Sequence, residues 1–217
     1  MNTAAPPYRH TNDELKVLAA LLKRPPWKLH GDADREDRGT RAAFRRWSPT
    51  TGEPSYSLTA PIWLRLNEIE EHRARQDWDS LVPATWTEND REEVVRRAAT
   101  LLHLVALQPD DGRPVDNFGA ACRAAGVSNG RFARLVNPPP DVARRVEALS
   151  RAFRRFRQQG VHLRLFAEAE KQKERLAELW AFHTFLFTDD PARAVSRWAQ
   201  GYFWQPKATP ETTPAEA

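Results

Sequence analysis

Arginines crowd into two stretches of the chain, and the first is "DRGTRAAFRRW", residues 37 to 47. It places four arginines beside two aromatic residues: Arg38, Arg41, Arg45 and Arg46 with Phe44 and Trp47. A guanidinium group presents a planar fork of N–H donors that fits phosphate and carboxylate oxygens, and it also stacks on flat rings. The chemistry that these residues favour is the binding of an anion.

The second stretch runs from residue 123 to residue 157 and has nine arginines, no lysine and only two acidic residues, a local balance of +7. The whole chain has a net charge of +4 and a pI near 9.5. The arginines are Arg123, Arg131, Arg134, Arg144, Arg145, Arg151, Arg154, Arg155 and Arg157. Such an excess predicts a surface that binds a polyanion. The alternative is a surface that meets an acidic protein.

Helical spacing separates these arginines from the apolar residues. At about 100° per residue, Arg38, Arg41 and Arg45 share one face of a helix. In a longer helix, residues 141 to 159, apolar residues recur at intervals of three and four, and Arg144, Arg151 and Arg155 fall together on the opposite side. We therefore expect two exposed rows of arginines, each backed by an apolar face.

The elements that must position these rows are helices. Apolar periodicity with start and stop signals predicts helices at residues 11 to 23, 32 to 47, 59 to 76, 88 to 107, 115 to 125, 129 to 136, 141 to 159, 173 to 187 and 191 to 203. Thr11 and Glu14 have the spacing of a capping box. The prediction is an all-α fold of two packed helical subdomains, a helical bundle, with residues 11–107 in the first and 108–204 in the second. Residues 1–10 are expected to be flexible, 48–57 to form a loop and 205–217 to be disordered.

Composition favours a globular protein of the cytoplasm. The chain has 217 residues, of which 41% are hydrophobic, enough for an ordinary core. It contains no long apolar run and no secretory leader, so we expect neither a membrane span nor export. The single cysteine, Cys122, fits a reducing compartment.

Motifs for catalysis are absent from the sequence. The six histidines are scattered, with no H-E-x-x-H and no cysteine pair, so we expect no metal site. Cys122 lies among alanines and is interpreted as a small packed residue. Pairs of acidic residues are interpreted as caps and surface charges, and there is no glycine-rich phosphate loop. We therefore expect no catalytic residues, no cofactor and no enzymatic activity.

The order of motifs resembles a known family. "DRGTRAAFRRW" is followed by "LLHLVAL", "NFGAACRAAG", "GRFARLV", the long helix "VARRVEALSRAFRRF" and finally "RWAQGYFW". This series, across residues 27 to 204, is similar to the CasB-type small subunit of Cascade, the type I-E CRISPR surveillance complex. The loop at 48–57 and the tail from residue 205 look like additions to the family's pattern.

The resemblance implies an all-α protein of two helical subdomains without enzymatic activity. It implies that two copies lie beside the backbone and large subunits of the complex, where they contact guide RNA and target DNA and help to hold the hybrid and the displaced strand. The positions that it marks for nucleic-acid contact are Arg38, Arg41, Arg45, Arg46, Arg123, Arg131, Arg134, Arg144 and Arg151, to which helical spacing adds Arg155.

Two other classes of function remain open. A free-standing DNA-binding regulator would use "VSNGRFARL" as the recognition helix of a helix-turn-helix. A structural adaptor would turn its arginines toward acidic protein surfaces. The eight tryptophans are interpreted mainly as core anchors, although exposed ones, for which we single out Trp27, would serve as partner contacts or stacking surfaces.

Overall fold

The computed structural model describes residues 11–28, 37–47, 52–109, 111–137, 139, 141–165 and 176–204. In these ranges the chain forms nine helices and two short strands, which confirms the prediction of a mainly helical fold. The predicted flexible residues 1–10, the first part of the loop at 48–57 and the tail at 205–217 lie outside the described residues.

The first half of the chain contributes four helices: α1 (Thr11–Lys23), α2 (Arg38–Arg46), α3 (Tyr56–Arg75) and α4 (Glu88–Ala106). Asp37 caps α2 by accepting from the backbone N–H groups of Gly39 and Thr40. Thr87 and Asp90 form a reciprocal capping box at the start of α4. The helix α3 begins at Tyr56, three residues before its predicted start, so the predicted loop at 48–57 is two residues too long.

The second half contributes five helices: α5 (Phe118–Ala124), α6 (Asn129–Val136), α7 (Val142–Gln158), α9 (Ala177–Phe187) and α10 (Ala192–Phe203). Asn117 caps α5 and Asp141 caps α7, each through its side chain. Gly126 after α5 and Gly160 after α7 adopt positive φ values of 69° and 60°. Glycine reaches this left-handed conformation at little cost, which explains why both helices stop where the sequence predicts.

Two strands interrupt the otherwise helical chain. β1 (Arg113–Val115) and β2 (Val161–Leu163) pair in parallel, with Arg113 opposite Val161. Gln108 supports the pair, since its side-chain oxygen accepts from Leu163 N at 2.7 Å. The prediction of an all-α fold misses these strands because three residues are too few to show an alternating pattern.

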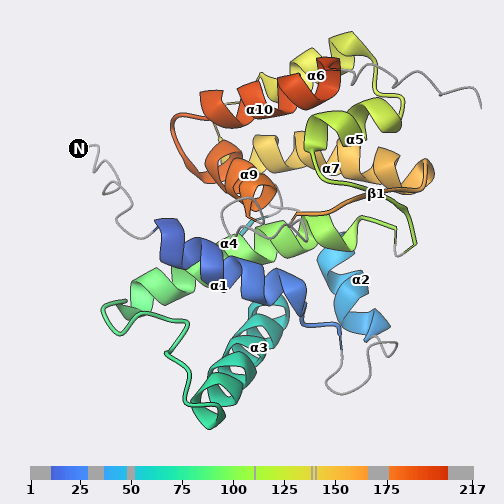
Figure 1. Ribbon diagram of the computed structural model, residues 1–217. Coiled ribbons are helices and arrows are strands. Elements are labelled where there is room, and N and C mark those ends of the chain that lie inside the picture. The colour runs from blue at the N-terminus through green and yellow to red at the C-terminus, as the bar shows by residue number, and fades with distance from the viewer. Residues whose placement is uncertain are drawn as a thin grey trace, which may run out of the picture.

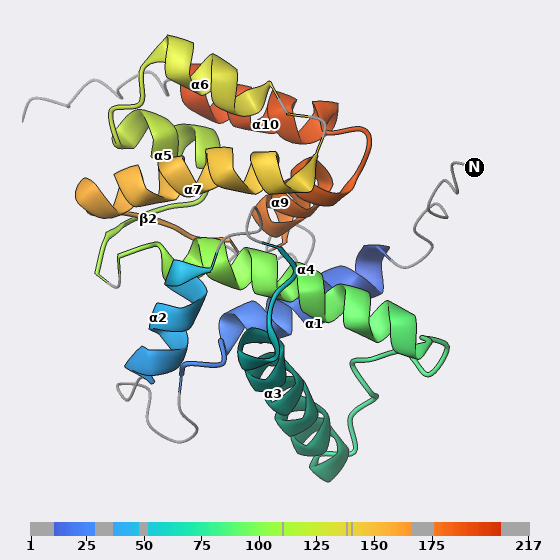
Figure 2. The same ribbon diagram turned by 180° about the vertical axis from the view of Figure 1, so that it is seen from behind.

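The helices gather in two halves that share one core. Figure 1 shows α1 to α4 in the lower half and α5 to α10 in the upper half, and Figure 2 shows the same division from behind. The buried apolar side chains nevertheless form a continuous cluster from Leu15 on α1 to Tyr202 on α10. α4 packs against α7, and α1 packs against α9, so both pairs join the halves. The boundary between residues 107 and 108 as a division into subdomains stays a prediction.

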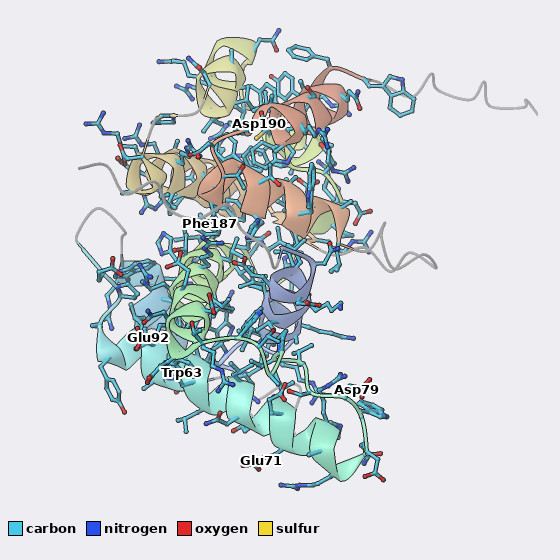
Figure 3. All side chains as sticks on the ribbon, turned by 90° about the vertical axis from the view of Figure 1, so that its left-hand side faces the viewer. Trp63, Glu71, Asp79, Glu92, Phe187 and Asp190 are labelled. Carbon is cyan, nitrogen blue, oxygen red and sulfur yellow. The ribbon has the colours of Figure 1, made fainter. Side chains whose placement is uncertain are left out.

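A buried ion cluster lies where the halves meet. Arg97 of α4 donates to Glu14 of α1 at 2.9 and 3.1 Å, and His183 of α9 lies 3.1 Å from the same carboxylate. Burial alone would raise the pKa of Glu14, but His183 and Arg97 outweigh it and hold that pKa below its ordinary value. The Arg97 guanidinium also lies 5.1 Å from the ring centre of Phe187, which Figure 3 shows between α9 and α4. Glu14, placed by the sequence in a capping box, thus joins α1 to α4 and α9.

Replacing Arg97 with Met tests this cluster. The change removes the guanidinium from the buried Glu14 carboxylate and leaves only His183 beside it, so we expect the free energy of unfolding to fall by about 3 kcal/mol or more. Urea denaturation provides the measurement. Arg75→Met is the control, because Arg75 forms an exposed pair with Glu71, and it should change stability by less than about 1 kcal/mol. Equal losses in the two variants would show that the cluster does not hold the halves together.

Candidate nucleic-acid interface

The arginines of α2 do not form the exposed row that helical spacing predicts. Arg41 is buried, with 5% of its surface exposed, and its guanidinium donates to the carbonyl oxygen of Gln108 at 3.2 Å. Arg45 is half-buried, and its Nε donates to the carbonyl oxygen of Ala106 at 2.5 Å. The expectation of exposed guanidinium groups is wrong at these two positions.

The end of α4 explains this burial. The last carbonyl groups of a helix have no partner within the helix and carry partial negative charge, so a cation beside them is favourable. Arg41 is about 60° around α2 from the buried Phe44 and therefore lies at the edge of the buried face. Helical spacing groups the arginines correctly, but it does not reveal that α4 covers their side of α2. Arg38 and Arg46 remain exposed.

Three further arginines of the second stretch also bind helix ends. Arg145 is buried and donates to the carbonyl oxygens of Phe185 and Thr188, which close α9. Arg123 donates to the carbonyl oxygens of Tyr202 and Trp204 at the end of α10. Arg155 is exposed overall, yet its Nε donates to Ala125 O after α5. The predicted contact residues Arg123 and Arg155 thus have structural partners, and Arg123 is only half-exposed.

The arginines that remain on the surface concentrate on α6 and α7. Arg131 and Arg134 are both exposed, and they lie about 100° and about 160° around α6 from the buried Phe132. On α7, the side chains of Arg144 and Arg151 are 72% and 71% exposed, and each pairs with an exposed acid of the preceding turn, Asp141 and Glu147 respectively. Surface pairs of this kind contribute less than about 1 kcal/mol, so a phosphate can replace the acid at little cost.

Arg154 belongs to the same surface of α7, although the site prediction omits it. It is exposed, and three residues of helix place it about 60° from Arg151. The apolar positions of α7 are the signal that identifies it, because they define which part of the helix surface is exposed, and Arg154 lies within that part. Arg144, Arg151 and Arg154 are called the α7 row below.

A buried histidine connects α2 and α7, the helices of the two predicted arginine rows. His103 of α4 contacts the carbonyl oxygen of Phe44 through Nδ1 at 2.7 Å and Ser150 Oγ through Nε2 at 3.0 Å. Burial lowers the pKa of His103, the Phe44 carbonyl opposes this, and the charge of Arg154 lowers it further. A neutral imidazole whose Nδ1–H donates to Phe44 fits these contacts. His103 is therefore a structural link under the surface.

The described residues hold one buried cysteine and no metal-binding cluster. Burial raises the pKa of the Cys122 thiol well above its ordinary value, which keeps it protonated. No cluster of three or more His, Cys, Asp or Glu side chains within the described ranges is arranged to hold a metal ion. None of the helices in those ranges is long and apolar enough to cross a membrane.

No protein-family model, curated protein or solved structure matches this chain. Support for a nucleic-acid interface therefore comes from the exposed arginines of α6 and α7 and from the order of the sequence motifs. Six of the ten predicted contact residues are exposed, and within the described part of the chain none of the six donates to a backbone carbonyl of another helix. These six are Arg38, Arg46, Arg131, Arg134, Arg144 and Arg151.

Stability should separate the two kinds of arginine. Replacing Arg41 with Ala removes a charge-assisted hydrogen bond from a buried carbonyl, so we expect the free energy of unfolding to fall by about 2 kcal/mol. Replacing Arg144 or Arg151 with Ala should change it by no more than about 0.5 kcal/mol each. Urea denaturation of the three variants measures this. A decrease at Arg144 or Arg151 as large as that at Arg41 would contradict the division.

Proposed function

We propose that this protein is a non-catalytic small subunit of a CRISPR RNA-guided DNA surveillance complex of the Cascade type. In this role the α7 row, with Arg131 and Arg134 of α6, contacts nucleic-acid backbones and stabilises the guide RNA–target DNA hybrid and the displaced strand. The observation that carries the proposal is the exposed row of α7, since its arginines face away from the core and the acids that Arg144 and Arg151 meet there form weak surface pairs. The helical fold and the order of the six sequence motifs support the same proposal.

The spacing of the row suits a nucleic-acid backbone. Arg144 and Arg151 are seven residues apart, about 10 Å along a helix that rises about 1.5 Å per residue. That distance covers about three nucleotide steps of a duplex strand, which rise about 3.4 Å each. A surface of this kind grips phosphates without reading bases, as required where guide pairing selects the sequence.

The energetics of target opening also fit modest contacts. Pairing a target with a guide exchanges DNA base pairs for hybrid base pairs of similar stability, so the equilibrium is nearly balanced. A few phosphate contacts, each worth about 1 kcal/mol, are enough to shift it. Arginine serves this purpose at any target sequence, because its fork fits the phosphate oxygens of every nucleotide.

Binding by the isolated protein gives the first test. Replacing Arg144, Arg151 and Arg154 together with Ala should weaken binding to single-stranded DNA and reduce the slope of log affinity against log salt by about 0.7 for each phosphate that the variant no longer neutralises. Anisotropy titrations at several salt concentrations measure both quantities.

The control removes the same amount of charge elsewhere. The control variant replaces three exposed arginines with Ala: Arg24 just after α1, Arg75 on α3 and Arg91 on α4. Its affinity for single-stranded DNA should stay closer to that of the unchanged protein. Equal weakening in the two triple variants would show that only net charge matters. A strong preference for one short duplex would instead support the free-standing regulator.

Assembly gives the second test. When the protein is coexpressed with the products of its neighbouring genes, we expect it to purify with a guide RNA and several other subunits, in two copies per particle by native mass measurement. The variant with the α7 row replaced should still assemble and load guide RNA, but the opened target should have a shorter lifetime by permanganate reactivity. Copurification with an acidic protein and no RNA would favour the adaptor.

A further inference from the structure

The outer layer of the upper half is rich in arginine and poor in acids. Figure 1 shows α6 and α10 side by side at the top of the molecule, with α5 beneath them. These three helices carry five arginines, Arg123, Arg131, Arg134, Arg193 and Arg197, and no aspartate or glutamate. Exposed Asp189 and Asp190 precede α10, and Arg197 pairs with the buried Glu178. The five arginines still outnumber these three acids, so the layer is a positive surface distinct from the α7 row.

Two large aromatic side chains project from this layer into solvent. Phe203 is 62% exposed and Trp204 is 68% exposed, whereas the neighbouring Tyr202 is buried. Most of the tryptophans serve the core, as expected, and Trp27, the position expected to be exposed, is 2% exposed. Two adjacent exposed rings on a positive surface therefore mark a candidate binding site.

The backbone beneath these rings is held in place. The Tyr202 ring stacks on Phe132 of α6, with the ring centres 4.0 Å apart and an interplanar angle of 7°. Arg123 donates to the carbonyl oxygens of Tyr202 and Trp204 at 3.2 and 2.8 Å. The rings of Phe203 and Phe132 are nearly perpendicular, with centroids 6.1 Å apart. Phe203 therefore lies against α6, whose exposed side carries Arg131 and Arg134.

We infer that Phe203 and Trp204 form a stacking site for unpaired bases of a single-stranded nucleic acid, with Arg131 and Arg134 supplying contacts to its phosphates. Rings that stack on bases, set beside arginines that bind the backbone, are how proteins hold single strands without sequence preference. A duplex offers these rings little, because its base faces are covered by neighbouring pairs. The inference rests on the proposed binding of nucleic acid and adds a preference for unpaired strands.

Two other exposed apolar residues lie on a helix that carries acids as well as arginines. Tyr56 and Leu64 project from α3, which lies at the far end of the molecule from α6 and α10. Exposed acids accompany them there, among them Glu71, which Figure 3 labels on the outer side of α3. A carboxylate repels a phosphate backbone, so α3 serves as a control surface and not as a second candidate.

The test replaces aromatic rings while keeping apolar volume. The double variant Phe203→Leu/Trp204→Leu should bind an oligothymidylate single strand more weakly by at least about fivefold, while its affinity for a duplex of the same length stays unchanged. The conservative pair Phe203→Tyr/Trp204→Phe should keep the affinity for the single strand. Tyr56→Leu on α3 should change neither affinity. Thermal melts of each variant verify that the fold is retained.

The outcomes separate this inference from the proposed function. Should the unchanged protein bind both probes and the leucine pair bind them equally well, the stacking site is wrong while the arginine surface stands. Equal weakening for single strand and duplex also overturns the inference, because stacking requires unpaired bases. Should the unchanged protein bind neither probe at low salt, the proposed function fails and the stacking site with it.

Discussion

The fold depends on arginine guanidinium groups that close the carbonyl ends of helices. Arg41 and Arg45 bind the end of α4, Arg145 binds the end of α9, and Arg123 binds the end of α10. Each contact joins elements that are distant along the chain, and each satisfies carbonyl oxygens that have no partner within their own helix. Lysine cannot replace arginine here as readily, because a single guanidinium donates from two separate nitrogens at once. Arg145 does so from Nε to the carbonyl oxygen of Pro139 and from Nη1 to those of Phe185 and Thr188.

This interaction divides the arginines into two groups that composition cannot tell apart. The local balance of +7 between residues 123 and 157 includes Arg145, which is buried, and Arg123, which is held by the end of α10. Only part of the positive charge therefore reaches the surface, concentrated on α6 and on the outward side of α7. The same residue type builds the scaffold and provides the surface, so the function of each arginine follows from its neighbours.

Sequence predicts this structure well where the signal is local and poorly where it is not. Thr87 and Asp141 mark helix starts, and Gly126 and Gly160 mark helix ends, because caps and left-handed turns involve only a few adjacent residues. The three-residue strands escape detection because they are stabilised by each other across the fold. The burial of Arg41 escapes it because periodicity gives the angle of a side chain around its own helix and not which helix covers that side.

Arg123 shows how closely scaffold and surface are linked in this protein. The sequence marks it as a nucleic-acid contact, yet its guanidinium holds the backbone from which Phe203 and Trp204 project. Weaker binding on replacing Arg123 would therefore not identify a phosphate contact, since the same change frees the aromatic end. Arg131 and Arg134 lack this ambiguity, because they are exposed and the only described hydrogen bond from either side chain runs within α6, to Gly130. Contacts to nucleic acid are therefore best assigned first at residues such as Arg131 and Arg134, whose replacement leaves the hydrogen bonds at the carbonyl ends of the helices intact.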